Sequence, residues 1–121
     1  MEKLTRTEEP VMQIIWKLEK VFVKDIIDKL LEPKPPYNTI SSIVRGLESK
    51  GMVGHESFGR THRYFPLVTK SSYKRLIFKS LLTDYFEGSY ANLMSFMIKS
   101  NDLKEDEEKE LRKLIDKHYG E

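Results

Sequence analysis

The spacing of apolar residues changes between the first 50 residues and the next 20, and this change constrains the fold more than any other feature. Three stripes with helical spacing come first: Val11, Ile14, Ile15 and Leu18; then Val23, Ile26, Ile27, Leu30 and Leu31; then Ile40, Ile43, Val44 and Leu47. From Met52 to Leu67 the pattern indicates two short strands around a turn that contains Gly59. Three helices followed by a β-hairpin predict a winged helix-turn-helix.

Capping and turn residues predict where these elements begin and end. Thr5 and Glu8 have the spacing of a capping box ahead of a helix over about residues 6–19. Val21 and Phe22 favour a short strand, and Pro33 should stop the second helix. We expect Asn38 or Thr39 as the N-cap of the third helix and Gly51 as a left-handed residue after its end.

Helical spacing returns at Thr69 and continues to the C-terminus. It predicts a long helix that weakens near Gly88, a second from Tyr90 to Ile98, and a last one that includes Leu103 and is capped by Asn101 or Asp102. The expected fold is therefore mainly α with a small β-hairpin. It would comprise a winged-helix DNA-binding domain over residues 1–70 and a helical dimerisation domain over residues 71–121.

The second domain has more apolar side chains than three short helices can bury by themselves. Pairing with the same segment of a second chain would bury them, so the sequence predicts a homodimer. The residues expected at this contact are Leu76, Ile77, Leu81, Leu93, Met94, Met97, Leu111, Leu114 and Ile115.

Charge is divided unevenly along the chain. Residues 34–75 carry eight Lys and Arg against two Asp and Glu, whereas residues 76–121 carry seven against ten. A local basic excess favours a polyanion, here double-stranded DNA. The candidate DNA contacts are Asn38, Thr39, Ser41, Ser42, Arg45 and Lys50 on the third helix and Arg60, His62 and Arg63 on the hairpin.

Each candidate also has a plain structural interpretation. Asn38 and Thr39 could be helix caps only, and Ser41 and Ser42 could be merely solvated. Lys50 at a helix end suits the helix dipole equally well, and cations at a hairpin tip often serve solubility.

Several classes of protein are disfavoured by what the sequence lacks. There is no cysteine, and no apolar run approaches the ~20 residues of a membrane span, so we expect a cytoplasmic protein without thiolate metal sites. The three histidines are scattered and no catalytic motif occurs. We expect no enzyme activity, cofactor, metal or small-molecule ligand.

The same stretches resemble the penicillinase-repressor family of bacterial regulators, the BlaI/MecI type. The resemblance lies in Leu4-Thr5 with Val11-Met12 and Ile15-Trp16, in Thr39-Ile40 through Leu47 to Lys50-Gly51, and in Arg63-Tyr64-Phe65-Pro66-Leu67, and it continues in Phe96, Leu103 and the run from Glu110 to Ile115. It implies a homodimeric transcriptional repressor bound to an inverted-repeat operator.

The resemblance also implies a membrane-bound sensor peptidase whose activation leads to cleavage in the dimerisation domain. Ser95-Phe96 aligns with the family's scissile bond, where asparagine is usual before the phenylalanine. The copper-responsive relatives carry a cysteine cluster, which this chain lacks. The alternative function is a winged-helix protein–protein adaptor without DNA binding, which the basic third helix and hairpin disfavour.

Overall fold

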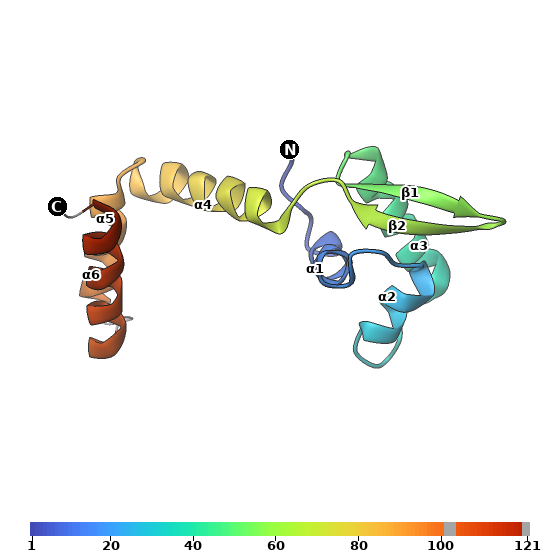
Figure 1. Ribbon diagram of the computed structural model, residues 1–121, viewed down its shortest axis with the longest axis horizontal. Coiled ribbons are helices and arrows are strands. Elements are labelled where there is room, and N and C mark those ends of the chain that lie inside the picture. The colour runs from blue at the N-terminus through green and yellow to red at the C-terminus, as the bar shows by residue number, and fades with distance from the viewer. Residues whose placement is uncertain (101–103, 120–121) are drawn as a thin grey trace. The chain divides into compact units, whose positions relative to one another are not determined.

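The computed structural model describes residues 1–100 and 104–119, without the side chains of residues 115, 118 and 119. The elements follow in the order α1 (Glu8–Leu18), α2 (Val23–Lys29), α3 (Tyr37–Ser49), β1 (Val53–Phe58), β2 (Thr61–Pro66), α4 (Lys70–Phe86), α5 (Tyr90–Lys99) and α6 (Glu105–Tyr119). This mainly helical order with one hairpin confirms the predicted fold class (Figure 1).

The chain divides into two compact units, Met1–Ile77 and Phe78–Glu121. The division falls inside α4 because the start of that helix belongs to the N-terminal core. Tyr73 is buried there, and Leu76 packs against the same cluster. Each unit is therefore described by itself.

The N-terminal core is made by the predicted apolar stripes and one side of the hairpin. Its buried members are Val11, Met12, Ile15, Val21, Val23, Ile26, Ile40, Val44, Leu47, Met52, Val53, Tyr64 and Tyr73. Burial of each large aliphatic side chain contributes about 1.5–3 kcal/mol, so this cluster fixes the three helices against one another.

The start of α1 differs slightly from the expected boundary. The Thr5 N–H donates to Glu8 Oε1 at 2.8 Å and the Glu8 N–H to Thr5 Oγ1 at 3.3 Å, so the predicted reciprocal bonds are present. The helix nevertheless begins at Glu8 rather than at residue 6, because residues 6 and 7 form the turn that these bonds close.

The second helix is shorter than its apolar stripe suggests. It ends at Lys29, and Leu31, the last member of the stripe, is 89% exposed. The expected strand before α2 is reduced to one residue, Val21, which forms an antiparallel bridge with Tyr64 of β2. This bridge joins the α1–α2 connection to the hairpin.

The hairpin pairs β1 and β2 antiparallel, in the register that runs from Val53 opposite Pro66 to Phe58 opposite Thr61. Only Gly59 and Arg60 remain between the strands, and Gly59 has φ of 63°, which suits the tight turn. In Figure 1 the turn end of the hairpin extends beyond the helices of its unit. The hairpin thus has the form of a wing.

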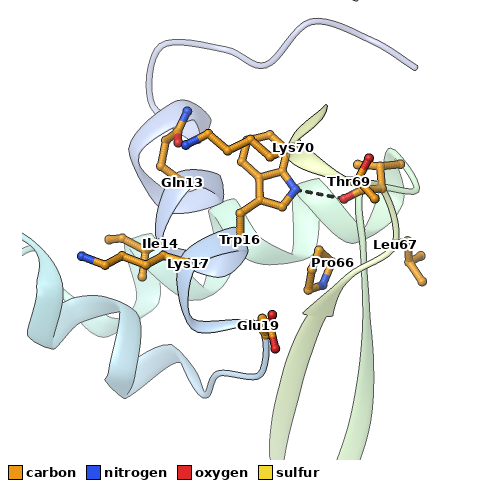
Figure 2. A pocket seen from close by; sticks show the side chains of 10 residues that line it. Gln13, Ile14, Trp16, Lys17, Glu19, Pro66, Leu67, Thr69 and Lys70 are labelled. Atoms are coloured by element: carbon orange, nitrogen blue, oxygen red, sulfur yellow. Dashed lines mark hydrogen bonds between the residues drawn. The ribbon is translucent and has the colours of Figure 1, made fainter. Parts of the chain in front are cut away.

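An aromatic contact holds the start of α4. The Trp16 Nε1–H donates to the Val68 carbonyl at 2.9 Å, as Figure 2 shows, and the Trp16 and Tyr73 ring centroids are 5.5 Å apart. Tyr73 Oη in turn accepts from the Leu4 N–H at 2.8 Å. These contacts attach the first turn of α4 to α1.

The C-terminal unit contains the rest of α4 with α5 and α6. Positive φ values at Glu87 and Gly88 end α4 where the sequence predicted weakening, and Ser89 caps α5 by accepting from the Asn92 N–H at 3.1 Å. Four acidic residues occupy the first turn of α6, which suits the helix dipole. The predicted caps Asn101 and Asp102, and Leu103, lie outside the described residues.

Candidate nucleic-acid interface

The α3 helix exposes the polar face that the sequence predicted. Ile40, Val44 and Leu47 are buried in the core. The remaining positions leave Asn38, Thr39, Ser42 and Arg45 exposed and Ser41 half-buried. This face carries hydrogen-bonding groups and one cation, which is the chemistry that contacts bases and phosphates in a DNA groove.

The prediction that Asn38 or Thr39 caps α3 is wrong. Pro36 is the N-cap, and its carbonyl accepts from the Thr39 N–H at 3.1 Å and the Ile40 N–H at 3.3 Å. The extended backbone that precedes α3 therefore ends two or three residues earlier than expected. Asn38 and Thr39 lie in the first helical turn and are exposed. The predicted left-handed Gly51 is confirmed, with φ of 78°.

The tip of the wing presents a cation. Arg60 is fully in the turn and exposed, and it makes no hydrogen bond or ion pair within the described part of the chain. The neighbouring Thr61 Oγ1–H donates to the Phe58 carbonyl at 2.8 Å and closes the turn. Arg60 can therefore reach an anion without breaking an existing contact.

The helix and the wing meet around a polar hollow of about 330 Å³. Its lining brings together five predicted site residues, Asn38, Ser41, Arg45, Arg60 and His62, with three residues that sequence reasoning missed, Val23, Tyr37 and Tyr64. The candidates come from segments about 20 residues apart in sequence, so only the fold could bring them together. Thr39 and Ser42 do not line this hollow.

Arg63 is engaged inside the hairpin. Its Nη2–H donates to Glu56 Oε1 at 3.1 Å, and its guanidinium carbon lies 4.7 Å from the centroid of the Phe58 ring. The Nε atom is buried without a hydrogen-bond partner among the described residues. Arg63 therefore stabilises the wing from one face, and it does not line the polar hollow with Arg60.

Lys50 is also already paired. Its Nζ–H donates to Glu8 Oε1 at 2.7 Å, which joins the end of α3 to the start of α1. Burial by itself would raise the pKa of Glu8, but the hydrogen bonds from Lys50 and Thr5 together hold it below its ordinary value. The same hydrogen bond raises the pKa of Lys50. The ion pair neutralises the charge of Lys50, which was one of the candidate DNA contacts.

The two histidines of the hairpin stack on each other. The His55 and His62 ring centroids are 4.1 Å apart with planes inclined by 8°, and His55 Nδ1 lies 2.6 Å from Glu48 Oε2. Burial, with a smaller contribution from Glu48, raises the pKa of the adjacent Tyr64. The stack fixes His62 at the rim of the polar hollow.

No group of three metal-binding side chains occurs among the described residues.

A separate hollow of about 750 Å³ lies beside Trp16, between α1 and the segment that leads from β2 into α4 (Figure 2). It is lined by Gln13, Ile14, Trp16, Lys17, Glu19, Pro66, Leu67, Val68, Thr69 and Lys70. None of these is a predicted site residue. The five candidates that share a hollow therefore do so on the α3–wing side of the unit.

The residues predicted for dimerisation have differing surroundings. Leu76 packs against the N-terminal core, and Leu93, Met94, Met97 and Leu111 are half-buried. Ile77, Leu81 and Leu114 are exposed at 36%, 41% and 50%. The side chain of Ile115 lies outside what the structure describes.

The aligned cleavage position lies within a regular helix. Ser95 is half-buried and Phe96 is 56% exposed, both in the middle of α5. The Phe96 ring contacts the Phe86 ring edge-to-face, with centroids 5.5 Å apart.

No helix of the described residues is long and apolar enough to cross a membrane.

Three packed helices and a wing that share a basic, polar hollow define a winged helix-turn-helix protein. The model of the penicillinase repressor family matches residues 4–117, and the chain belongs to that family, whose members are regulatory repressors. This confirms the resemblance.

Two relatives show how far the similarity extends. The chain is 26% identical over 116 residues to the methicillin resistance regulatory protein MecI of Staphylococcus aureus strain N315, covering 95% of this chain and 94% of that protein. It is 24% identical over 117 residues to the penicillinase repressor of Bacillus licheniformis, covering 96% and 91%. Both relatives match over the N-terminal and the C-terminal units.

Proposed function

We propose that this protein is a sequence-specific repressor that binds duplex DNA through α3 and the wing. The observation that carries the proposal is the polar hollow, where Arg45 and Arg60 lie with Asn38 and Ser41. Cations at the edge of such a surface neutralise phosphates, and short polar side chains at a helix N-terminus reach base edges. Membership of a repressor family supports the same function.

The roles of the basic residues follow from their surroundings. Arg60 has no competing partner among the described residues, so it is the wing residue assigned to the DNA backbone. Arg45 Nε makes one long hydrogen bond of 3.4 Å to the Ser41 carbonyl, which a stronger phosphate or guanine contact can replace. Arg63 and Lys50 support the fold of this surface from their pairs with Glu56 and Glu8.

We also propose that the repressor acts as a homodimer through its C-terminal unit. Large apolar side chains of that unit face solvent: Phe78, Leu81, Tyr85, Tyr90, Phe96, Ile98 and Leu114 are between 41% and 77% exposed. Among the described residues of the C-terminal unit, Leu82 is the one large hydrophobic residue that is buried. A two-fold partner would cover these groups and present two α3 helices to an inverted-repeat operator.

Release of the operator by proteolysis extends this proposal. Cutting at Ser95-Phe96, for example by a membrane-bound sensor peptidase, would separate the two DNA-binding units and remove their cooperative binding. The helical setting of this bond means that α5 has to open locally before a protease can take the chain in extended form.

The test is to select binding sequences from a random duplex library with the full chain and then measure affinity against salt. We expect an inverted-repeat motif. Replacing Arg60 with alanine should reduce the steepness of log K against log salt by about 0.9 for each phosphate that the side chain neutralises in the wild type. The matched control is Lys113→Ala, an exposed cation of α6.

A different result would favour the adaptor function. If no duplex is enriched and the full chain shows no salt-dependent binding, the DNA-binding proposal is wrong. If binding occurs but Arg60→Ala and Lys113→Ala have equal slopes, the wing does not contact the DNA backbone.

A further inference from the structure

An exposed aromatic residue stands at the first position of α3. Tyr37 is 54% exposed and follows the extended Pro36. It lines the polar hollow with Asn38 and Arg45 on one side, and on the other side it lines a second hollow of about 410 Å³. Val23 and His62 are also common to both hollows. Tyr37 therefore lies at the boundary between them.

The second hollow has an apolar wall. Phe22 and Val23 face it together with Tyr37, and Lys24, Asp25, Thr61 and His62 complete its lining. The Phe22 ring is held by an edge-to-face contact with Phe58, with centroids 5.9 Å apart. This contact with Phe58 of β1 positions the Phe22 side of the wall.

The charged groups around the apolar wall favour an anionic partner. The Asp25 carboxylate accepts from the Phe22 N–H at 2.9 Å and so serves the start of α2. Lys24 is exposed, and it makes no ion pair among the described residues. With Arg45 and Arg60 beside the adjoining hollow, the surface around Tyr37 is cationic although its centre is apolar.

A DNA duplex offers one apolar group of matching kind on its base edges. The 5-methyl group of thymine projects into the major groove, where the N-terminal residues of a recognition helix make base contacts. Tyr37 occupies the N-terminal position of that helix. A single exposed tyrosine would mean little elsewhere on the surface, but here it lies among the groups assigned to DNA.

We propose that Tyr37 is a specificity-determining residue whose ring packs against a thymine methyl group in each operator half-site. This inference rests on the proposed DNA-binding function. The ring makes the contact, so the hydroxyl is not required for it. The same contact discriminates thymine from cytosine and from the uracil of RNA, both of which lack the methyl group.

The experiment uses the full chain and the duplex enriched from a random library. Each thymine is replaced singly by deoxyuridine, which removes only the 5-methyl group. We expect one position in each half-site at which this change weakens wild-type binding about four-fold, the effect of one buried methyl group. Tyr37→Ala should bind the duplex with thymine and the duplex with deoxyuridine at that position equally. Tyr37→Phe should keep the four-fold preference for thymine.

Leu31→Ala is the matched control, because Leu31 is an exposed apolar residue of the same unit that lines neither hollow. It should keep the wild-type preference. The inference is overturned if Tyr37→Ala retains the deoxyuridine effect, or if wild type shows no such effect at any thymine. Failure of wild type to bind any duplex would instead refute both this inference and the proposed function.

Discussion

Replacing Leu81 with alanine tests the proposed dimer at a position where the change should leave the protomer folded. Leu81 lies in α4 within the C-terminal unit and is 41% exposed. Alanine is the most favourable residue in a helix, so α4 itself should not be weakened. The exposed part of the leucine side chain is what a second protomer would cover.

The size of the effect follows from that exposed part. Complete burial of a leucine contributes about 1.5–3 kcal/mol, so the exposed two-fifths would contribute roughly 0.6–1.2 kcal/mol in each protomer. A two-fold interface contains the residue twice. The dimer dissociation constant should therefore rise roughly 8- to 60-fold.

Sedimentation equilibrium of the full chain over a dilution series measures this constant directly. The matched control is Leu31→Ala, which removes an 89% exposed leucine from the N-terminal unit and should leave dimerisation unchanged. An unchanged dissociation constant for Leu81→Ala would show that this face of α4 is not part of the interface. A wild-type chain that sediments as a monomer would refute the dimer itself.

Two further predictions concern the stability of the N-terminal unit. Trp16→Phe removes the donor to the Val68 carbonyl and should lower the free energy of unfolding by about 1–2 kcal/mol in urea titrations, and an unaltered midpoint would contradict this. The pKa of Glu8 is lowered by folding, so its ion pair stabilises the fold above its ordinary value of 4.5, and this contribution disappears as the pH falls through the lowered pKa. Glu8→Gln should therefore be less stable than wild type near neutral pH, and the difference in the free energy of unfolding should shrink below pH 4.5. A difference that does not change with pH would show that titration of Glu8 does not contribute to stability.

Local features of the sequence predicted most of the fold because they depend on near neighbours in the chain. Spacings of three and four residues placed Val11, Ile15, Val44 and Leu47 in the core. Gly51 and Gly59 were predicted at turns, and both have positive φ. The order of three helices and a hairpin, and with it the fold class, followed from these signals.

Boundaries were less predictable where two local signals compete. Pro36 is the N-cap residue of α3, a position expected of Asn38 or Thr39. Leu31 continues the apolar stripe of α2, although that helix has already ended at Lys29. A polar residue near a helix start and an apolar residue near its end do not by themselves specify the terminal hydrogen bonds.

The partners of the charged side chains were decided only by the tertiary structure. Lys50 pairs with Glu8, 42 residues away, and Arg63 pairs with Glu56 across the hairpin, so two of the predicted DNA-contacting cations already have partners. Tyr37 joined the site because α2, α3 and the wing converge on it. The sequence by itself determined which residues could bind a polyanion, through their charge and their place on each element. Which of them remain available depended on contacts between segments distant in the chain, because an ion pair or a hollow forms through space and leaves no periodic pattern in the sequence.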